Sequence, residues 1–181
     1  MKVPPRSYFR SQSGYTLIEV IITSLIGMVV MSALTSVVLT TWRANTTATS
    51  RVEASSQIRN FQLRAYEDFA RSRLPAIAGC GASQGNPCTT TPVSVTGLQV
   101  NDPAKLSVSP YTVSYAWDGV RFLDRQAAND PPKHIATNVS GFSWYVDGNT
   151  VVVNVTITIN DLQSNPVYSE SQVLRFYPRV T

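Results

Sequence analysis

The chain has 181 residues, 43% of them hydrophobic, so we expect one globular core of ordinary size with an appendage. Its formal net charge is +4, but Lys2, Arg6 and Arg10 precede Gly14, and without them the charge is 4 − 3 = +1. The totals argue against two large domains and against a strongly basic nucleic-acid-binding protein.

A short polar segment precedes a long apolar one. Residues 1–14 are polar and basic and contain no acid, whereas residues 15–40 are apolar apart from Glu19, Gly27 and several hydroxyl residues. The second segment is long enough to cross a bilayer as a helix, and the positive-inside rule keeps residues 1–14 cytoplasmic. The leader-like boundary lies before the apolar run, so removal of residues 1–14 would retain the helix.

The pattern becomes amphipathic over residues 41–74. Apolar residues recur there at spacings of three and four, which predicts a helix with one apolar face. No Pro or Gly interrupts the chain between Met28 and Leu74, so one helix from about residue 15 to residue 74 is expected, ended by Pro75. The main stripe is Ala54, Ile58, Phe61, Ala65 and Phe69, with Leu63, Tyr66 and Ala70 in a second row beside it.

Residues 75–110 are rich in turn-forming residues and predict a long irregular connection, with a short strand near residues 93–100. Cys80 and Cys88, the only cysteines, lie within it. We expect a disulfide between them, which requires an oxidising compartment and contributes on the order of 2–3 kcal/mol. Two free thiols are the alternative; two cysteines without a nearby histidine cannot fill a tetrahedral zinc site.

The hydrophobic period becomes two in the remaining segment, residues 111–181. Two hairpins are expected, one turning at Asp118-Gly119 and one at Asp147-Gly148-Asn149, followed by a last strand. The segment therefore predicts an antiparallel sheet of four to six strands, covered by the amphipathic half of the helix in an α+β fold. The expected strands are residues 111–117, 120–123, 139–146, 151–159 and 171–177.

The motif Gly14-Tyr15-Thr16-Leu17-Ile18-Glu19, between a basic segment and an apolar helix, resembles the type III signal of type IV pilins and pseudopilins. The resemblance implies that prepilin peptidase cuts after Gly14, that Tyr15 becomes the N-methylated first residue, and that Glu19 serves subunit assembly. It also implies a pilin-like fold, with residues 15–40 as transmembrane and filament-core helix and residues 75–110 as the αβ-loop. One departure is Ser36, where many pilins have a helix-kinking Pro.

The C-terminal half is most similar to minor pilins of the PilW kind and to J-type pseudopilins of type II secretion. The resemblance implies a low-abundance subunit that joins a pilus or primes its assembly, supporting motility, adhesion or DNA uptake. A J-type pseudopilin is the alternative. A hypothesis from another class of protein is a non-polymerising single-pass membrane protein with a ligand-binding outer domain. The residues that carry this similarity are Trp117-Asp118-Gly119, Phe142-Ser143-Trp144-Tyr145 and Leu174-Arg175-Phe176.

Glu19 is unusual for a membrane-spanning helix, because a carboxylate in hydrocarbon costs about 2.5–3.5 kcal/mol on insertion scales. The expected partner is the ammonium at Tyr15, on the same chain or on a neighbouring subunit. The other implied partners are prepilin peptidase, other pilin or pseudopilin subunits, the inner-membrane assembly platform and, before assembly, the lipid bilayer. The implied location is the bacterial inner membrane with the C-terminal domain outside the cytoplasm, and then a pilus or pseudopilus.

No pattern predicts an enzyme, a cofactor or a metal site. There is no nucleophile elbow, phosphate loop or paired-carboxylate spacing, and a lone His134 in a polar loop is expected to face solvent. The aromatic residues Trp117, Trp144 and Tyr145 alternate as core or face residues do. DNA is a partner that no motif supports, because the positive residues outside the helix are dispersed. These are Arg121, Arg125, Lys133, Arg175 and Arg179.

Overall fold

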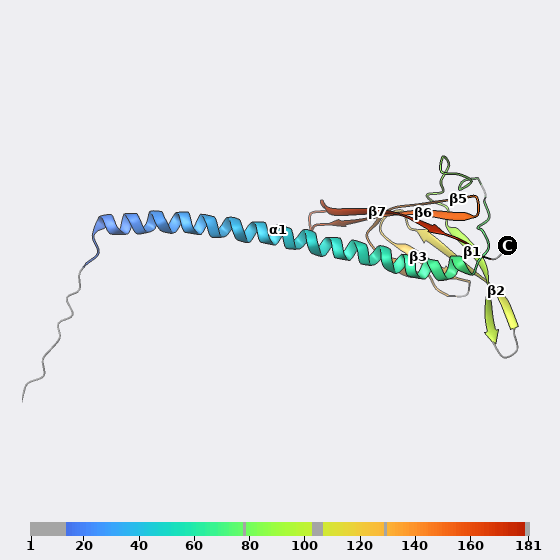
Figure 1. Ribbon diagram of the computed structural model, residues 1–181. Helices are drawn as coiled ribbons and strands as arrows, with labels where there is room; N and C mark the ends of the chain where they lie inside the picture. Colours follow the sequence, from blue (N-terminus) through green and yellow to red (C-terminus); the bar gives the residue numbers. More distant parts are fainter. Residues whose placement is uncertain (1–13, 78, 103–106, 129, 180–181) are drawn as a thin grey trace, which may run out of the picture. The chain divides into compact units, whose positions relative to one another are not determined.

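The computed structural model describes residues 14–77, 79–102, 107–128 and 130–179 (Figure 1). The expected leader residues 1–13 lie outside this range. The chain forms two compact units, Met1–Asn45 and Thr46–Thr181, and the single helix of the described residues belongs partly to each. The elements are α1 (Leu17–Ala70), β1 (Val93–Asp102), β2 (Ser107–Trp117), β3 (Leu123–Ala127), β4 (Lys133–Ala136), β5 (Val139–Asp147), β6 (Thr150–Asn160) and β7 (Pro166–Phe176).

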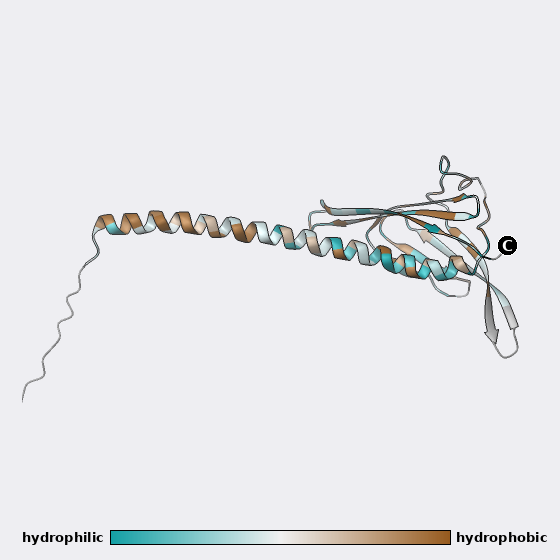
Figure 2. Cartoon of the chain, viewed as in Figure 1, coloured by the Kyte–Doolittle hydropathy of each residue, from teal (hydrophilic) through white to brown (hydrophobic). Residues whose placement is uncertain are grey.

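The first unit contains the apolar part of α1. Every described side chain from residue 14 to residue 45 is exposed, and Figure 2 shows the hydrophobic colour concentrated there. By length and composition this helix can cross a membrane. Its hydroxyl groups donate to carbonyl groups one turn earlier, as Thr23 Oγ1 does to Glu19 O at 2.9 Å and Ser36 Oγ to Ala33 O at 2.8 Å. These hydroxyls need no water, so an apolar environment tolerates them.

The helix ends at Ala70 rather than at Leu74. Ser72 tightens the last turn, because its N and its Oγ both donate to the Phe69 carbonyl, at 3.2 and 2.9 Å. Ser72 then forms a β-bridge with Gly97 of β1. The chain is thus turned toward the sheet before it reaches Pro75.

The second half of α1 packs on the sheets through the predicted stripe. All five stripe residues, Ala54 to Phe69, are at most 1% exposed, which confirms the prediction. The second row behaves differently, since Leu63 is 62% and Tyr66 58% exposed. Leu63 follows Phe61 by two positions, about 200° around the helix, so it faces away from the sheets.

Within the described residues the strands form two antiparallel sheets instead of the single sheet expected. Their orders are β1-β2-β3-β4 and β5-β6-β7. The expected irregular segment 75–110 contains all of β1 and the start of β2, and β3 and β4 were not predicted as strands of these lengths. Asn138, at φ 59°, lies between β4 and β5, where the chain passes from one sheet to the other. Asn adopts this left-handed conformation more readily than most residues.

The two Asp-Gly turns differ. Gly148 and Asn149 connect β5 to β6 as predicted, with Gly148 at φ 60°. Asp118-Gly119 instead begins a five-residue loop, residues 118–122, between β2 and β3. The Asp118 Oδ1 accepts backbone N–H bonds from Val120, Arg121 and Phe122 at 2.8, 2.7 and 2.9 Å, and these bonds, that of Arg121 foremost, lower the pKa of Asp118.

The core lies between the two sheets and the second half of α1. Phe61 of α1 meets Tyr115 of the first sheet edge-to-face at 5.7 Å, and Phe142 and Phe176 of the second sheet at 6.5 and 6.4 Å. Such aromatic pairs add to the stabilisation from burial alone. One helical side chain therefore joins both sheets.

Candidate functional site

The expected processing motif lies at the exposed start of α1. Tyr15 is 81% exposed and precedes the first helical residue by two positions. Thr16 is the N-cap residue, because its carbonyl accepts the first helical N–H bond, from Glu19 N at 3.1 Å. Thr is a favoured N-cap residue, a signal that the sequence analysis did not use.

Gly14 is not required by the packing of the chain itself. A Cβ built on it would meet no atom within 4 Å, and its φ is not in the left-handed region. The described structure therefore accommodates any residue at this position. A requirement for glycine would come from a protein that binds this segment, such as a peptidase with a narrow site.

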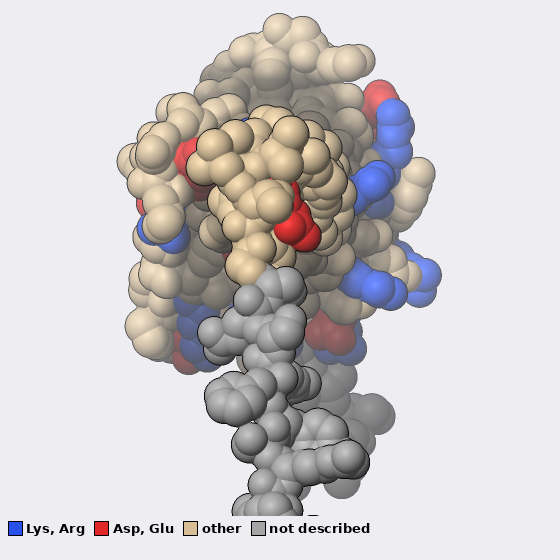
Figure 3. Space-filling model, turned by 90° about the vertical axis from the view of Figure 1, so that its left-hand side faces the viewer, with Lys and Arg blue, Asp and Glu red and all other residues tan. Residues whose placement is uncertain are grey.

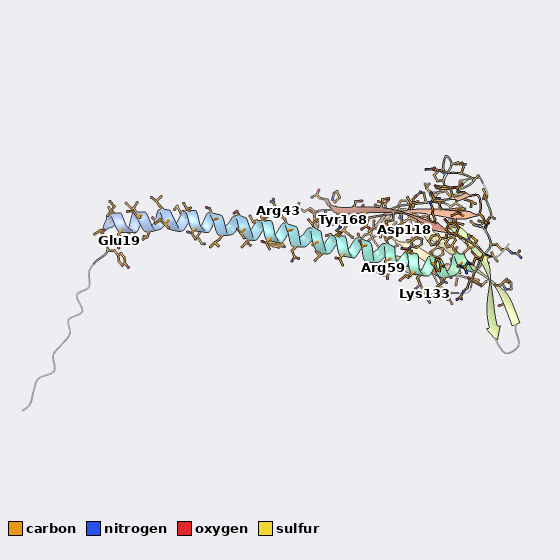
Figure 4. The ribbon with its side chains drawn as sticks, viewed as in Figure 1. Glu19, Arg43, Arg59, Asp118, Lys133 and Tyr168 are labelled. Atoms are coloured by element: carbon orange, nitrogen blue, oxygen red, sulfur yellow. A yellow bond between two sulfur atoms is a disulfide. The ribbon has the colours of Figure 1, made fainter. Side chains whose placement is uncertain are left out.

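Glu19 places a carboxylate on an otherwise apolar surface. It lies in the first helical turn, where the helix dipole favours negative charge, and Figure 4 shows it near the start of α1. Its neighbours Ile18 and Ile22 are 67% and 51% exposed, and no other described residue forms a hydrogen bond or ion pair with its carboxylate. Figure 3, which looks onto this end of the chain, shows an acidic group surrounded by uncharged residues. In an apolar environment this carboxylate needs a cation from elsewhere.

The expected disulfide between Cys80 and Cys88 is confirmed. Cys88 is 1% exposed and extends the second sheet by pairing with Trp144, since each residue's N–H donates to the other's carbonyl, at 2.8 and 2.9 Å. The disulfide therefore ties residues 79–92 to the outer edge of β5.

Gly81 lets the tied loop lie close against β5. It has φ 81°, and a Cβ there would be 3.0 Å from the Trp144 ring and 3.1 Å from Cys88 Sγ. Its carbonyl accepts a bond from Val146 N at 2.8 Å. Residues 82–86, Ala-Ser-Gln-Gly-Asn, form the exposed and uncharged tip of the loop.

A buried ionic cluster that the sequence analysis missed joins α1 to the first sheet. Arg125 of β3 binds Asp68 of α1 through Nε at 2.7 Å and Nη2 at 3.0 Å, and the Tyr115 hydroxyl donates to the same carboxylate. Burial, and then the bond to Asp68, raise the pKa of Tyr115, and the bond to Asp68 raises the pKa of Arg125. An Asp three positions after Ala65 on an apolar stripe was the available signal.

The cluster borders an open cleft of about 850 Å³, also lined by Glu67, Arg71 and Tyr111. Both acidic and basic residues line it, and the described residues contain no group of three or more His, Cys, Asp and Glu that could hold a metal ion. The arrangement suits a structural connection better than catalysis.

The other residues considered in the sequence make local contacts. His134 lies in β4 rather than in a loop, but its side chain is 58% exposed, as expected, and it contacts Asp124 and stacks on Phe122 at 4.3 Å. Trp144 and Tyr145 are 2% and 6% exposed, so they do not form an open aromatic platform.

Three of the positive residues outside the helix have contacts with neighbouring side chains. Arg125 is paired with Asp68, and Lys133 lies 4.0 Å from Asp130. Arg121 lies over the Phe122 ring at 5.5 Å. These contacts give no support to DNA binding.

Comparisons with known proteins agree with the N-terminal motif. A family model described as the prokaryotic N-terminal methylation motif matches residues 9–35. No curated protein and no solved structure matches the chain. The matched range includes Gly14, Tyr15 and Glu19.

Proposed function

We propose that this chain, whose residues 9–35 match an N-terminal methylation motif, is a type IV pilin-like prepilin with a structural rather than enzymatic role, and more specifically a minor pilin. Prepilin peptidase cuts it between Gly14 and Tyr15, and the new N-terminus at Tyr15 is methylated. The mature subunit is held in the inner membrane by residues 15–40, with its C-terminal domain outside the cytoplasm, and then joins or primes a filament. The observation that carries this proposal is the motif at residues 9–35, with Glu19 on an apolar helix and no other described residue paired with its carboxylate.

The proposed assembly step follows from charge. Cleavage converts the Tyr15 amide nitrogen into an ammonium, which methylation leaves positively charged. In a filament core of stacked helices, the Tyr15 ammonium of an adjacent subunit can approach Glu19, and the pair needs less hydration than either charge alone. The same pairing would select helices that carry both groups in the correct axial register.

The minor role rests on the similarity of the C-terminal half. The residues that carry this similarity pack inside the domain. Phe142, Trp144 and Phe176 are at most 3% exposed, and the Trp117 indole N–H donates to Val139 O at 3.2 Å. They are therefore features of a domain type rather than of a binding site. The Cys80–Cys88 disulfide is compatible with a domain that folds outside the cytoplasm.

The first test is the mass of the N-terminus of protein extracted from membranes of peptidase-positive cells. A chain that begins at methylated Tyr15 is expected. A chain that still carries the residues before Tyr15 would contradict the proposal and favour the non-polymerising membrane protein.

The second test separates processing from assembly. Glu19→Val should be cut normally but enter filaments at least about tenfold less, because it leaves the Tyr15 ammonium of the adjacent subunit without its partner. Glu19→Asp, which keeps the charge, is the matched control and should retain more incorporation than Glu19→Val. Equal incorporation of Glu19→Val and wild type would refute the assembly role of Glu19.

A further inference from the structure

The two sheets have four edge strands, and the edges of β1 and β4 are protected by the chain itself. The β1 edge is bridged by Ser72 at Gly97, and Arg73 N donates to Thr96 O at 2.8 Å. The edge strand β4 has only four residues and begins at the charged Lys133, directly after two prolines. Covering segments, short strands, charges and prolines all keep a sheet edge from pairing with another chain.

The β5 edge of the second sheet is covered by the disulfide-tied loop. Cys88 pairs with Trp144, whose indole N–H also donates to Thr91 O at 2.8 Å. Val146 N is bonded to Gly81 O of the same loop. The opposite edge, β7 (Figure 1), has no such cover, because no described residue outside β6 forms a hydrogen bond with its backbone.

The strand β7 is long enough to accept another strand. It has 11 residues, and alternate residues of an edge strand direct their N–H and C=O groups away from the paired neighbour. Its charged residues, Glu170 and Arg175, are separated by the uncharged residues 171–174, among which Val173 is 60% exposed. Such an edge can bind an extended chain, which gains main-chain hydrogen bonds as an added strand.

A small pocket lies where the end of β7 meets α1. It has a volume of about 80 Å³ and is lined by Tyr66, Ala70, Phe176, Tyr177 and Arg179. Tyr66 and Tyr177 are 58% and 62% exposed. A pocket of this size holds more than one water molecule and accommodates a small apolar side chain. A strand added to β7 would place a side chain opposite Phe176, on the face where this pocket lies.

The side of α1 next to β7 is basic. Ser55 Oγ donates to Glu170 Oε2 at 2.9 Å, which places this side of α1 beside β7. Arg51 and Arg59, one turn before and one turn after Ser55, line the same open cleft as Ser55. Gln172 Nε2 also donates to the Glu170 carboxylate, at 3.0 Å. The one acid of β7 is therefore already bonded within its own unit.

Two further positive charges lie near the end of β7, on Arg175 and Arg179. No described residue forms an ion pair with these two arginines or with Arg51 and Arg59. Four free guanidinium groups beside one bonded carboxylate give this edge a positive potential. Charge complementarity therefore favours an acidic partner.

We propose that β7 is a docking edge for an extended, acidic segment of another protein, which adds to the second sheet as a fourth strand. Its backbone bonds to the outward-facing groups of β7, one small apolar side chain enters the pocket beside Tyr66 and Phe176, and its acidic side chains approach the four arginines. A second copy of this chain fits less well, because its other sheet edges are protected and its β7 carries one acid and one base. The docking edge belongs to the C-terminal unit alone and is independent of cleavage and filament assembly.

The test uses the full chain with its disulfide intact, in detergent micelles, and a fluorescein-labelled probe peptide of the sequence Asp-Val-Thr-Val-Asp-Val-Thr-Val. Fluorescence anisotropy measures binding of the peptide, and amide hydrogen exchange followed by mass spectrometry locates it. Saturable binding is expected, with slower exchange in β7. Exchange in β5 should stay unchanged, because its edge is already covered.

Two N-methylated versions of the peptide test strand addition itself. One carries methyl groups on the odd-numbered amides and the other on the even-numbered amides, so only one version loses the N–H groups that face β7. That version should bind at least about tenfold more weakly than the parent peptide, because several hydrogen bonds are lost together. The other version should bind like the parent.

Substitutions in the protein test the charges and the pocket. Arg59→Glu and Arg179→Glu should each weaken binding about fivefold, the upper range for one exposed ion pair. Ala70→Leu should also weaken binding, because the larger side chain fills the pocket. Arg64→Glu is the matched control and should leave binding unchanged, since Arg64 lines a cleft with Lys133 of β4 instead.

Three results would overturn the inference. The first is a peptide that does not bind saturably and leaves exchange in β7 unchanged. The second is equal binding of the parent and both N-methylated peptides, which would show electrostatic attraction without strand addition. The third is a free protein that is dimeric and already protected in β7, which would assign the edge to a second copy of the chain.

Discussion

Gly97 lies where β1 approaches the end of α1 most closely, and Gly97→Ala is a sharp test of that junction. A Cβ built on Gly97 would lie 2.6 Å from Arg71 O and 2.7 Å from the Tyr111 ring. Both distances are shorter than real Cβ contacts, and the nearer obstacle is a backbone atom that cannot rotate away. The substitution should therefore separate α1 from β1.

The size of the effect follows from the distances. Close carbon–oxygen contacts begin at about 3.3 Å, so the backbones must separate by about 0.7 Å. Overpacking of this kind lowers the free energy of unfolding by about 1–3 kcal/mol. Alanine also restricts the unfolded chain, which raises the free energy of unfolding by about 0.4–1 kcal/mol. The net loss of about 1–2 kcal/mol corresponds to a decrease in Tm of roughly 3–6 °C for a chain of this size.

Thermal unfolding of the full chain in detergent micelles, followed by near-ultraviolet circular dichroism, measures this loss. Gly85→Ala is the matched control, because its Cβ would meet only Ser83 Oγ, at 3.8 Å. The control should keep or slightly raise the Tm. A Gly97→Ala protein as stable as wild type would refute the reasoning that Gly97 is required by the α1–β1 contact.

Three further predictions concern the C-terminal unit. Reduction of Cys80–Cys88 should lower the free energy of unfolding by about 2.5 kcal/mol, the entropy of closing a loop of this length; an unchanged denaturation midpoint would contradict this. Phe61→Ala should cost about 3–5 kcal/mol, since three ring contacts are lost, whereas exposed Leu63→Ala should cost little; similar losses in urea unfolding would count against the described core. Burial raises the pKa of Tyr115 above its ordinary value of 10.0, so the tyrosine ionises in the unfolded chain before it ionises in the folded one. The contribution of Tyr115 to the free energy of unfolding is therefore complete below about pH 10 and decreases above about pH 10. The stability advantage of wild type over Tyr115→Phe should shrink above pH 10, and parallel curves of unfolding free energy against pH would refute this.

Local patterns were sufficient for the elements whose periodicity is strong. The stripe from Ala54 to Phe69 is buried as predicted, because a period near 3.6 places its members on one face of a helix. The Gly148-Asn149 turn was also predicted, since a glycine with positive φ joins two alternating strands. Cys80 and Cys88 were paired as the only two cysteines.

Hydrophobic patterns failed where a distant contact or a polar side chain decided the structure. The helix ends at Ala70 because Ser72 pairs with Gly97, a residue far along the chain. The loop at residues 118–122 replaces a two-residue turn because the Asp118 carboxylate accepts three backbone bonds. Neither outcome is encoded in hydrophobic spacing.

The sequence by itself was sufficient to identify the N-terminal motif, because the motif consists of a short run of residues: Gly14, Tyr15, Glu19 and the apolar helix that follows. The sequence also predicted which face of the helix is buried, because that signal is likewise local. Only the tertiary structure decided the split into two sheets and the Asp68–Arg125 pair. These depend on which strands pair and in what register, and pairing joins residues whose separation along the chain carries no local signal.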